Sequence, residues 1–146
     1  MLVRLLPEQI LKQWDILAPT LEATLPPVER TRMAAVLKSL LSGRLVMWLA
    51  LTTPNGKDSE VAAMVVTSLV QSACGEGCDL LIYALYGWDR IEPEMWTGGL
   101  STLQQYARGL KCDRIIAFTN VERVKQVVNQ LGGDTSWSLL TFPLEV

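Results

Sequence analysis

One stretch of the chain constrains the fold more than any other. The residues DLLIYALYGW, 79–88, are apolar at nearly every position after the first. Side chains of a strand alternate between its two faces. One face would carry Leu80, Ile82, Ala84, Tyr86 and Trp88, and the other Leu81, Tyr83, Leu85 and Gly87. Because both faces are apolar, we expect a central strand that is covered on both sides.

The segments before this strand predict helices and a hairpin. Leu2–Leu6 is a short strand-like segment, and a helix should begin at Pro7 and break or kink at Pro19. A second helix is predicted for residues 27–42, with Gly43 as its C-cap. Its apolar stripe is Met33, Val36, Leu37, Leu40 and Leu41. Residues 45–52 and 60–70 then predict a hairpin with Asn55-Gly56 at its tip.

The segments after the central strand alternate between helix and strand. Pro93 opens a helix that should end at Gly109, with Gly98-Gly99 inside it. Two glycines weaken a helix by about 1 kcal/mol each, which predicts close packing there. Residues 114–119 predict a strand, 121–131 a helix and 137–144 a final edge strand.

This order of elements predicts an α/β fold in a single domain, residues 1–146. The sheet should be mixed and mostly antiparallel, with six to seven strands and helices on both faces. The two strands joined through the helix after Pro93 should be parallel, because a long crossover connects them.

Composition excludes several classes of protein. Hydrophobic residues make up 49% of the chain, too many for a disordered one. No apolar run reaches the roughly 18 residues of a membrane span. The formal net charge of -2 argues against a nucleic-acid partner. The first residues lack a signal-peptide pattern, so we expect a cytoplasmic protein.

The three cysteines predict ordinary thiols. Cys74 and Cys78 have a spacing that could seat a metal, but the chain has no His and one further cysteine, Cys112. We therefore expect no metal site. A disulfide between Cys74 and Cys78 is an alternative for an oxidising compartment.

Four segments, taken in order, carry a family resemblance over essentially the whole chain. They are LVRLLPEQILKQW, YARGLKCDRIIAFTN, the pair formed by Asn120 and NQLGG, and TSWSLLTF. The first segment resembles the first strand, and its turn into a helix, of the GNAT superfamily of N-acetyltransferases. The second resembles the end of the family's third helix and its fifth strand. The third resembles the residues that bracket the fourth helix, and the last resembles the final strand. The resemblance implies a GNAT-like fold.

The resemblance also implies a place for acetyl-CoA. In the family, the pantetheine arm lies in a split beside the central strand, and the pyrophosphate sits on a glycine-rich loop at the next helix. Carried over to this chain, those contacts fall on Leu85, Tyr86, Arg90 and Asn120. Backbone N–H groups and the positive end of a helix favour a phosphate there.

The phosphate loop of this chain departs from the family's pattern. It reads GWDRIEPEMW, where Pro93 has no N–H to donate and three carboxylates belong to Asp89, Glu92 and Glu94. Like charge should weaken binding of a pyrophosphate. Gly98-Gly99 could replace this loop if the helix began at Ser101. Acetyl-CoA is therefore not expected as a cofactor in our first interpretation.

Catalytic residues of the family are not found either. The central strand offers Asp79 alone as a carboxylate, at the wrong end, and the place of the family's tyrosine acid holds Val127 or Val128. We name no catalytic residue. Asn120 is interpreted as the N-cap of the helix that follows it, in preference to a cofactor contact.

Our first functional interpretation is therefore a GNAT-like domain with a non-catalytic role. Its C-terminal pattern is similar to degenerate domains of bacteriophage virion and assembly proteins, which implies protein partners, self-association or a place in a virion. The alternative is an acetyl-CoA-dependent N-acyltransferase with an unorthodox phosphate loop, since such enzymes mainly orient an amine near a thioester. A small-ligand sensor is a third alternative, which no residue supports.

Overall fold

The computed structural model describes residues 1–53, 56, 58–88 and 90–144. The chain divides into two compact units, Met1–Ile116 and Ala117–Val146, and each is described by itself. The expected turn residue Asn55 and the carboxylate of Asp89 lie outside the described residues. The single domain over residues 1–146 stays a prediction.

The sheet has five strands in the order β1-β2-β3-β4-β5. These are β1 (Leu2–Arg4), β2 (Leu45–Thr52), β3 (Glu60–Gln71), β4 (Cys78–Gly87) and β5 (Arg114–Ala117). The first four pair antiparallel with their neighbours, which confirms the hairpin of β2 and β3. The predicted count of six to seven strands is wrong for the described residues.

Four helices precede the hairpin. They are α1 (Pro7–Lys12), α2 (Trp14–Thr24), α3 (Pro27–Arg30) and α4 (Met33–Ser42). Pro19 does not break the chain's second helix but lies inside α2, at an exposed position. The single helix predicted for residues 27–42 is two helices, and Gly43 ends the second one with a φ of +83°, as a C-cap glycine does.

One long helix, α5 (Pro93–Gly109), connects β4 to β5. It begins at Pro93, so the alternative start at Ser101 is wrong. The close packing predicted at Gly98-Gly99 is also wrong, because a Cβ added at either glycine would meet no atom within 4 Å.

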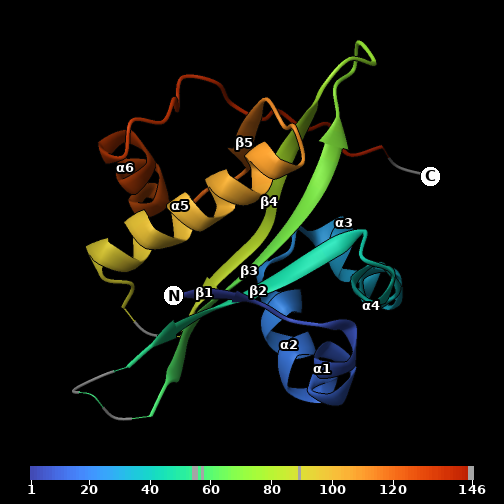
Figure 1. The fold of residues 1–146 in the computed structure, drawn as a ribbon. Coiled ribbons are helices and arrows are strands. Elements are labelled where there is room, and N and C mark those ends of the chain that lie inside the picture. The colour runs from blue at the N-terminus through green and yellow to red at the C-terminus, as the bar shows by residue number, and fades with distance from the viewer. Residues whose placement is uncertain (54–55, 57, 89, 145–146) are drawn as a thin grey trace. The chain divides into compact units, whose positions relative to one another are not determined.

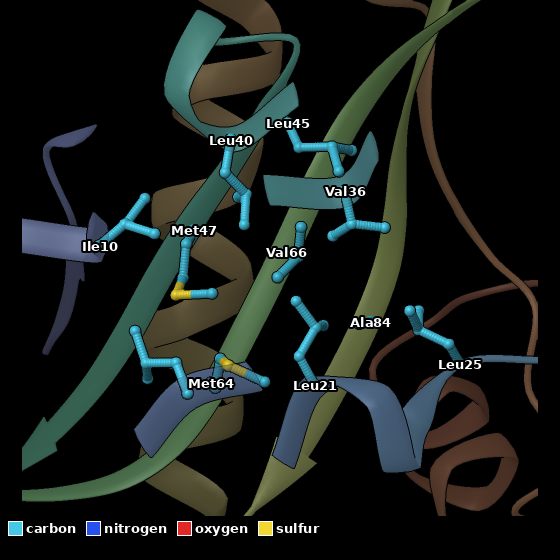
Figure 2. Close-up of a cluster of buried hydrophobic side chains, with 11 residues drawn as sticks. Ile10, Leu21, Leu25, Val36, Leu40, Leu45, Met47, Met64, Val66 and Ala84 are labelled. Carbon is cyan, nitrogen blue, oxygen red and sulfur yellow. The ribbon is translucent and has the colours of Figure 1, made fainter. Parts of the chain in front are cut away.

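The two faces of the sheet carry separate hydrophobic clusters, as predicted for a sheet covered on both sides. Side chains from α1, α2, α4 and strands β2 to β4 form the first cluster, which Figure 2 shows around Met47, Met64 and Val66. The second cluster lies on the face that α5 covers and contains Trp48, Leu80 and Leu103 (Figure 1). Within the predicted stripe of α4, Val36 and Leu40 are buried, whereas Leu41 is exposed.

The smaller unit contains α6 (Glu122–Gln130) and the chain after it. None of the described residues of this unit is buried. The strand predicted for residues 137–144 is wrong: no strand is formed there by the described residues, and Trp137, Leu140 and Phe142 are exposed. None of the described helices is long and apolar enough to cross a membrane.

Candidate functional site

An irregularity in the middle of β4 changes which way its side chains point. Val66 of β3 pairs with Ala84, and Thr67 pairs with Ile82, so Tyr83 has no partner in the register. Such a bulge interrupts the alternation of side chains. Ile82 therefore packs on the α5 face, while Ala84 packs on the opposite face. The prediction that Leu80 to Trp88 alternate regularly is wrong for this reason.

The neighbour of β4 on its other side is much shorter. β4 has ten residues and β5 has four. Both begin at the same edge, where the N–H of Asp113 donates to the carbonyl oxygen of Cys78 at 2.8 Å, as expected for parallel strands. At about 3.3 Å per residue, β5 reaches roughly to Ile82. Within the described larger unit, Ala84–Gly87 therefore have β3 as a neighbouring strand on one side and no strand on the other. We call these four residues the open edge.

Two of the predicted cofactor residues lie on this open edge. Leu85 packs toward α5, and Tyr86 packs against the first cluster, on the opposite face. The ring of Tyr86 also meets the ring of Trp88 edge-on, with centroids 5.4 Å apart. Because side chains on both faces hold the strand in place, the backbone groups at its edge have a fixed direction. That is the arrangement required of a backbone that binds an extended ligand.

The start of α5 carries charges of both signs. Glu92 is its N-cap and Glu94 lies in its first turn, where carboxylates complement the positive end of the helix dipole. The guanidinium Nε of Arg90 is 3.9 Å from the carboxylate of Glu92, and both side chains are mostly exposed. Glu92 and Glu94 therefore place negative charge at the start of α5, as predicted for this loop.

A buried donor lies within the first turns of the same helix. The indole Nε1 of Trp96 is buried and has no hydrogen-bond partner among the described residues. A buried N–H without a partner carries a desolvation penalty of about 1–3 kcal/mol, which an acceptor from a ligand or water would relieve. Sequence reasoning missed this donor, because its burial depends on packing around α5.

A tyrosine and a carboxylate meet at the bulge. The hydroxyl of Tyr83 donates a hydrogen bond to Oε2 of Glu29, which lies on α3. Burial raises the pKa of Tyr83 well above its usual value, and the hydrogen bond and the charge of Glu29 raise this pKa further. The phenol therefore stays protonated near neutral pH, while Arg32 approaches Glu29 to 3.9 Å. The partners are 54 positions apart in the sequence, so sequence reasoning missed this pair.

Asn120 does not serve as the predicted helix cap. The N-cap of α6 is Val121, and no side chain caps the helix. The hydroxyl of Thr119 accepts a hydrogen bond from the N–H of Val121 at 3.1 Å, one residue before the helix begins. The interpretation of Asn120 as a cap is therefore wrong. A cofactor contact by Asn120, which belongs to the smaller unit, stays a prediction.

Metal ligands do not gather in the described part of the chain: no group of three or more His, Cys, Asp or Glu side chains could hold an ion there. The candidate site is built on the open edge, the start of α5 and the Tyr83–Glu29 pair.

Comparison with solved structures gives the fold a name. A "probable acetyltransferase" superposes with a TM-score of 0.70 at 17% identity, covering 100% of this chain and 99% of that one. The fold is that of the GNAT acetyltransferases. AAC(6')-Iy bound to a bisubstrate analogue of CoA gives a TM-score of 0.71 at 12% identity, covering 100% and 98%. A ribosomal-protein-alanine N-acetyltransferase from Brucella melitensis biovar Abortus 2308 gives 0.66 at 12% identity, covering 99% of each chain.

Sequence comparisons were negative. No family model matches the chain, and no curated protein matches it. The GNAT fold predicted from the sequence is confirmed by the structural comparison, and at these identities the comparison extends to the fold alone.

Proposed function

We propose that the protein is an acyl-CoA-dependent N-acyltransferase. The open edge of β4 is the observation that carries this proposal, because within the described larger unit these residues have a neighbouring strand on one side alone, in a GNAT fold. The full-length likeness to acetyltransferases, one of them bound to a CoA conjugate, supports it further. This is the alternative interpretation of the sequence, and it now replaces the first one.

The residues around the open edge fit acetyl-CoA in part. Backbone groups of Ala84–Gly87 would bind the amides of the pantetheine arm, as an added strand would. Arg90 and the buried N–H of Trp96 would face the phosphates near the start of α5. Glu92 and Glu94 oppose the fit through like charge, so we expect modest affinity.

The chemistry supplied by the bound thioester is an activated acetyl group. An amine nitrogen attacks the carbonyl carbon, the carbon–sulfur bond breaks, and the products are an amide and the CoA thiol. The amine must lose a proton before or during the attack. We assign this proton to Glu29, with the hydroxyl of Tyr83 orienting the carboxylate.

Titration of the protein with acetyl-CoA tests the binding step. We expect saturable heat and a rise in melting temperature, since a ligand that binds the native state alone stabilises it as RT ln(1 + [L]/Kd). Release of free thiol in the presence of primary amines tests the transfer step. Absence of both signals would contradict the proposal.

The proposed base has a matched control. Glu29→Gln should lower kcat by about 10²–10⁴-fold while leaving the affinity for acetyl-CoA unchanged. Glu22→Gln replaces an exposed carboxylate on α2 and should leave both quantities unchanged. Equal rates for the two variants would show that Glu29 is not the base, and they would leave the proposed acyltransferase activity uncontradicted.

A non-catalytic role is the second candidate, and one observation favours it. Two carboxylates at the start of α5 occupy the place where an anion would bind. A role in a bacteriophage virion or in assembly, with protein partners, stays a prediction on this basis. A protein that fails to bind acetyl-CoA would support this candidate.

A further inference from the structure

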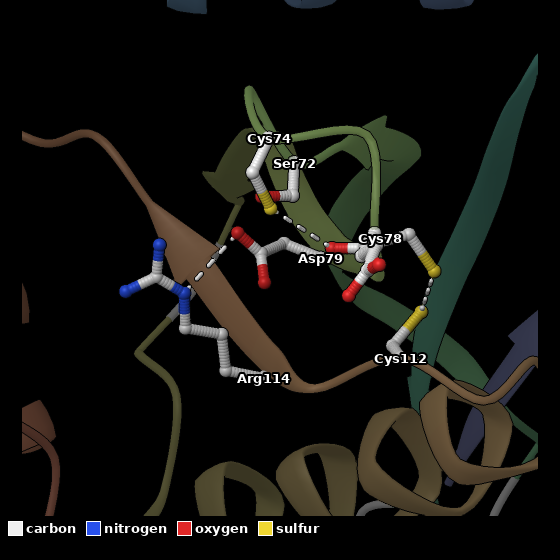
Figure 3. Close-up of polar contacts among 7 residues, drawn as sticks. Ser72, Cys74, Cys78, Asp79, Cys112 and Arg114 are labelled. Atoms are coloured by element: carbon white, nitrogen blue, oxygen red, sulfur yellow. Dashed lines mark hydrogen bonds and ion pairs between the residues drawn. The ribbon is translucent and has the colours of Figure 1, made fainter.

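Two cysteines that are distant in the sequence meet where β4 and β5 begin. Cys78 is the first residue of β4, and Cys112 lies two residues before β5. Their sulfur atoms are 3.5 Å apart, and Figure 3 shows the two side chains pointing toward each other. Both belong to the larger unit, and both are half-buried free thiols.

The backbone holds these two thiols in place. The N–H of Asp113 donates to the carbonyl oxygen of Cys78 at 2.8 Å, and the N–H of Cys112 donates to that of Ala107 at 2.9 Å. Gly77 has a φ of +83°, and a Cβ there would lie 2.2 Å from Oδ2 of Asp113. The two chain segments thus approach closely at a position that requires glycine.

A short movement would join the sulfurs. A disulfide has a sulfur–sulfur distance of about 2.05 Å, so the gap must close by roughly 1.5 Å. We expect side-chain rotation about the two Cα–Cβ bonds to supply this movement while the hydrogen-bonded backbone stays in place.

We propose that Cys78 and Cys112 are a modification site at which a low-molecular-weight disulfide installs a reversible disulfide bond. In the first step, the Cys78 thiolate attacks the small disulfide, forming a mixed disulfide and releasing one small thiol. In the second step, the Cys112 thiolate attacks the Cys78 sulfur and releases the second small thiol. The two cysteines lose two electrons and two protons, and the small disulfide gains both.

The surroundings of Cys112 explain why Cys78 reacts first with the small disulfide. Burial, and after it the hydrogen bond and the charge of the neighbouring Cys78, raise the pKa of Cys112 to about 11. Cys112 is therefore the poorer first nucleophile near neutral pH. Once Cys78 carries the small thiol, its contribution to this pKa is gone, and Cys112 becomes easier to ionise.

Cys74 is the competing thiol. It is exposed, and its sulfur contacts the hydroxyl of Ser72 at 3.1 Å and the carbonyl oxygen of Glu76 at 3.6 Å. The hydrogen bond from Ser72 lowers the pKa of Cys74, so small reagents should modify it readily. A bond between Cys74 and Cys78, which their spacing in the sequence suggests, is the rival outcome.

Peptide mapping separates the two bonds. After incubation of the full chain with oxidised glutathione, trypsin without reductant gives the peptides 58–90, which contains Cys74 and Cys78, and 112–114, which contains Cys112. We expect these two peptides to be linked, with the loss of two hydrogens, and to separate on reduction. The oxidised chain should also melt roughly 5 °C or more above the reduced chain.

Two variants assign the link. Cys74→Ser should preserve it, whereas Cys78→Ser should abolish it and leave glutathione on the remaining thiols. A link that survives in Cys78→Ser, a bond within peptide 58–90, or stable glutathione adducts without any link would each overturn the proposal. None of these readouts depends on acetyl-CoA, so the result is independent of the proposed enzyme activity.

Discussion

The two halves of β4 have different surroundings. At its start, β4 pairs with β3 on one side, and Asp113 and Arg114 contact it on the other. At its end, the open edge has β3 alone within the described larger unit. Figure 1 shows the short β5 beside the long β4. A single strand is thus anchored on both sides at its start and, within the larger unit, paired on one side alone at its end.

The largest expected effect is the loss of stability when a buried side chain is removed from the first half of β4 rather than the second. Leu80→Ala should lower the free energy of unfolding by roughly 2–5 kcal/mol, because Leu80 is 1% exposed and its removal leaves a cavity. Leu85→Ala, at the half-buried open edge, should lower it by about 1–2 kcal/mol. Urea melts measure both values. Equal losses would mean that the two halves are packed alike.

The next effect concerns the charge beside the open edge. Replacing both Glu92 and Glu94 by Gln should tighten acetyl-CoA binding about five- to tenfold at low salt, because like charges near the phosphates are removed. Isothermal titration at two salt concentrations measures the change, which should shrink at the higher one.

The control for this charge effect comes from another helix. Glu8→Gln removes a carboxylate that also follows a proline in a first helical turn, at the start of α1. Its binding constant should match that of the unmodified chain. A double Glu92 and Glu94 variant that binds no better would show that these carboxylates face away from the ligand.

A smaller effect is expected from the ion pair at the anchored end. Nε of Arg114 lies 3.1 Å from Oδ2 of Asp79, with the Arg114 side chain 70% exposed. Arg114→Ala should therefore lower stability by about 0.2–1 kcal/mol, as exposed pairs usually do. A loss above about 2 kcal/mol in thermal melts would mean that this pair, rather than backbone bonding, holds the strands together.

The smallest effect is expected at Asn120. Asn120→Ala should change stability by less than about 0.5 kcal/mol, because this residue is exposed and caps no helix. Asn120→Asp should weaken acetyl-CoA binding if the side chain contacts the ligand, and titration of both variants measures this. A stability loss of 1 kcal/mol or more in Asn120→Ala would restore the cap interpretation.

Local patterns in the sequence predicted elements well. The bounds predicted for β2 and for α5 match the structure, because a continuous apolar run marks the first element and Pro93 marks the start of the second. The pattern of residues 137–144 is equally strand-like, yet no strand forms among its described residues. A strand needs a partner edge, and alternation alone says nothing about one.

The two side-chain pairs on which the proposals rest could not be predicted, because each joins distant parts of the chain. Tyr83 and Glu29 are 54 residues apart, and Cys78 and Cys112 are 34 residues apart. The register shift at Tyr83 is a property of two strands together and leaves no mark on either one. Leu85 and Tyr86 were placed at the site by family resemblance, whereas Glu29 and Trp96 required the structure.

The empty space around Gly98-Gly99 has a consequence for motion. Glycine in a helix interior disfavours the helical state by about 1 kcal/mol relative to alanine, and here no close contact compensates. The first turns of α5 should therefore open locally more often than its last turns, and their amide protons should exchange with solvent faster. A ligand bound beside this helix would slow that exchange, so protection of these amides would report occupancy of the neighbouring strand edge.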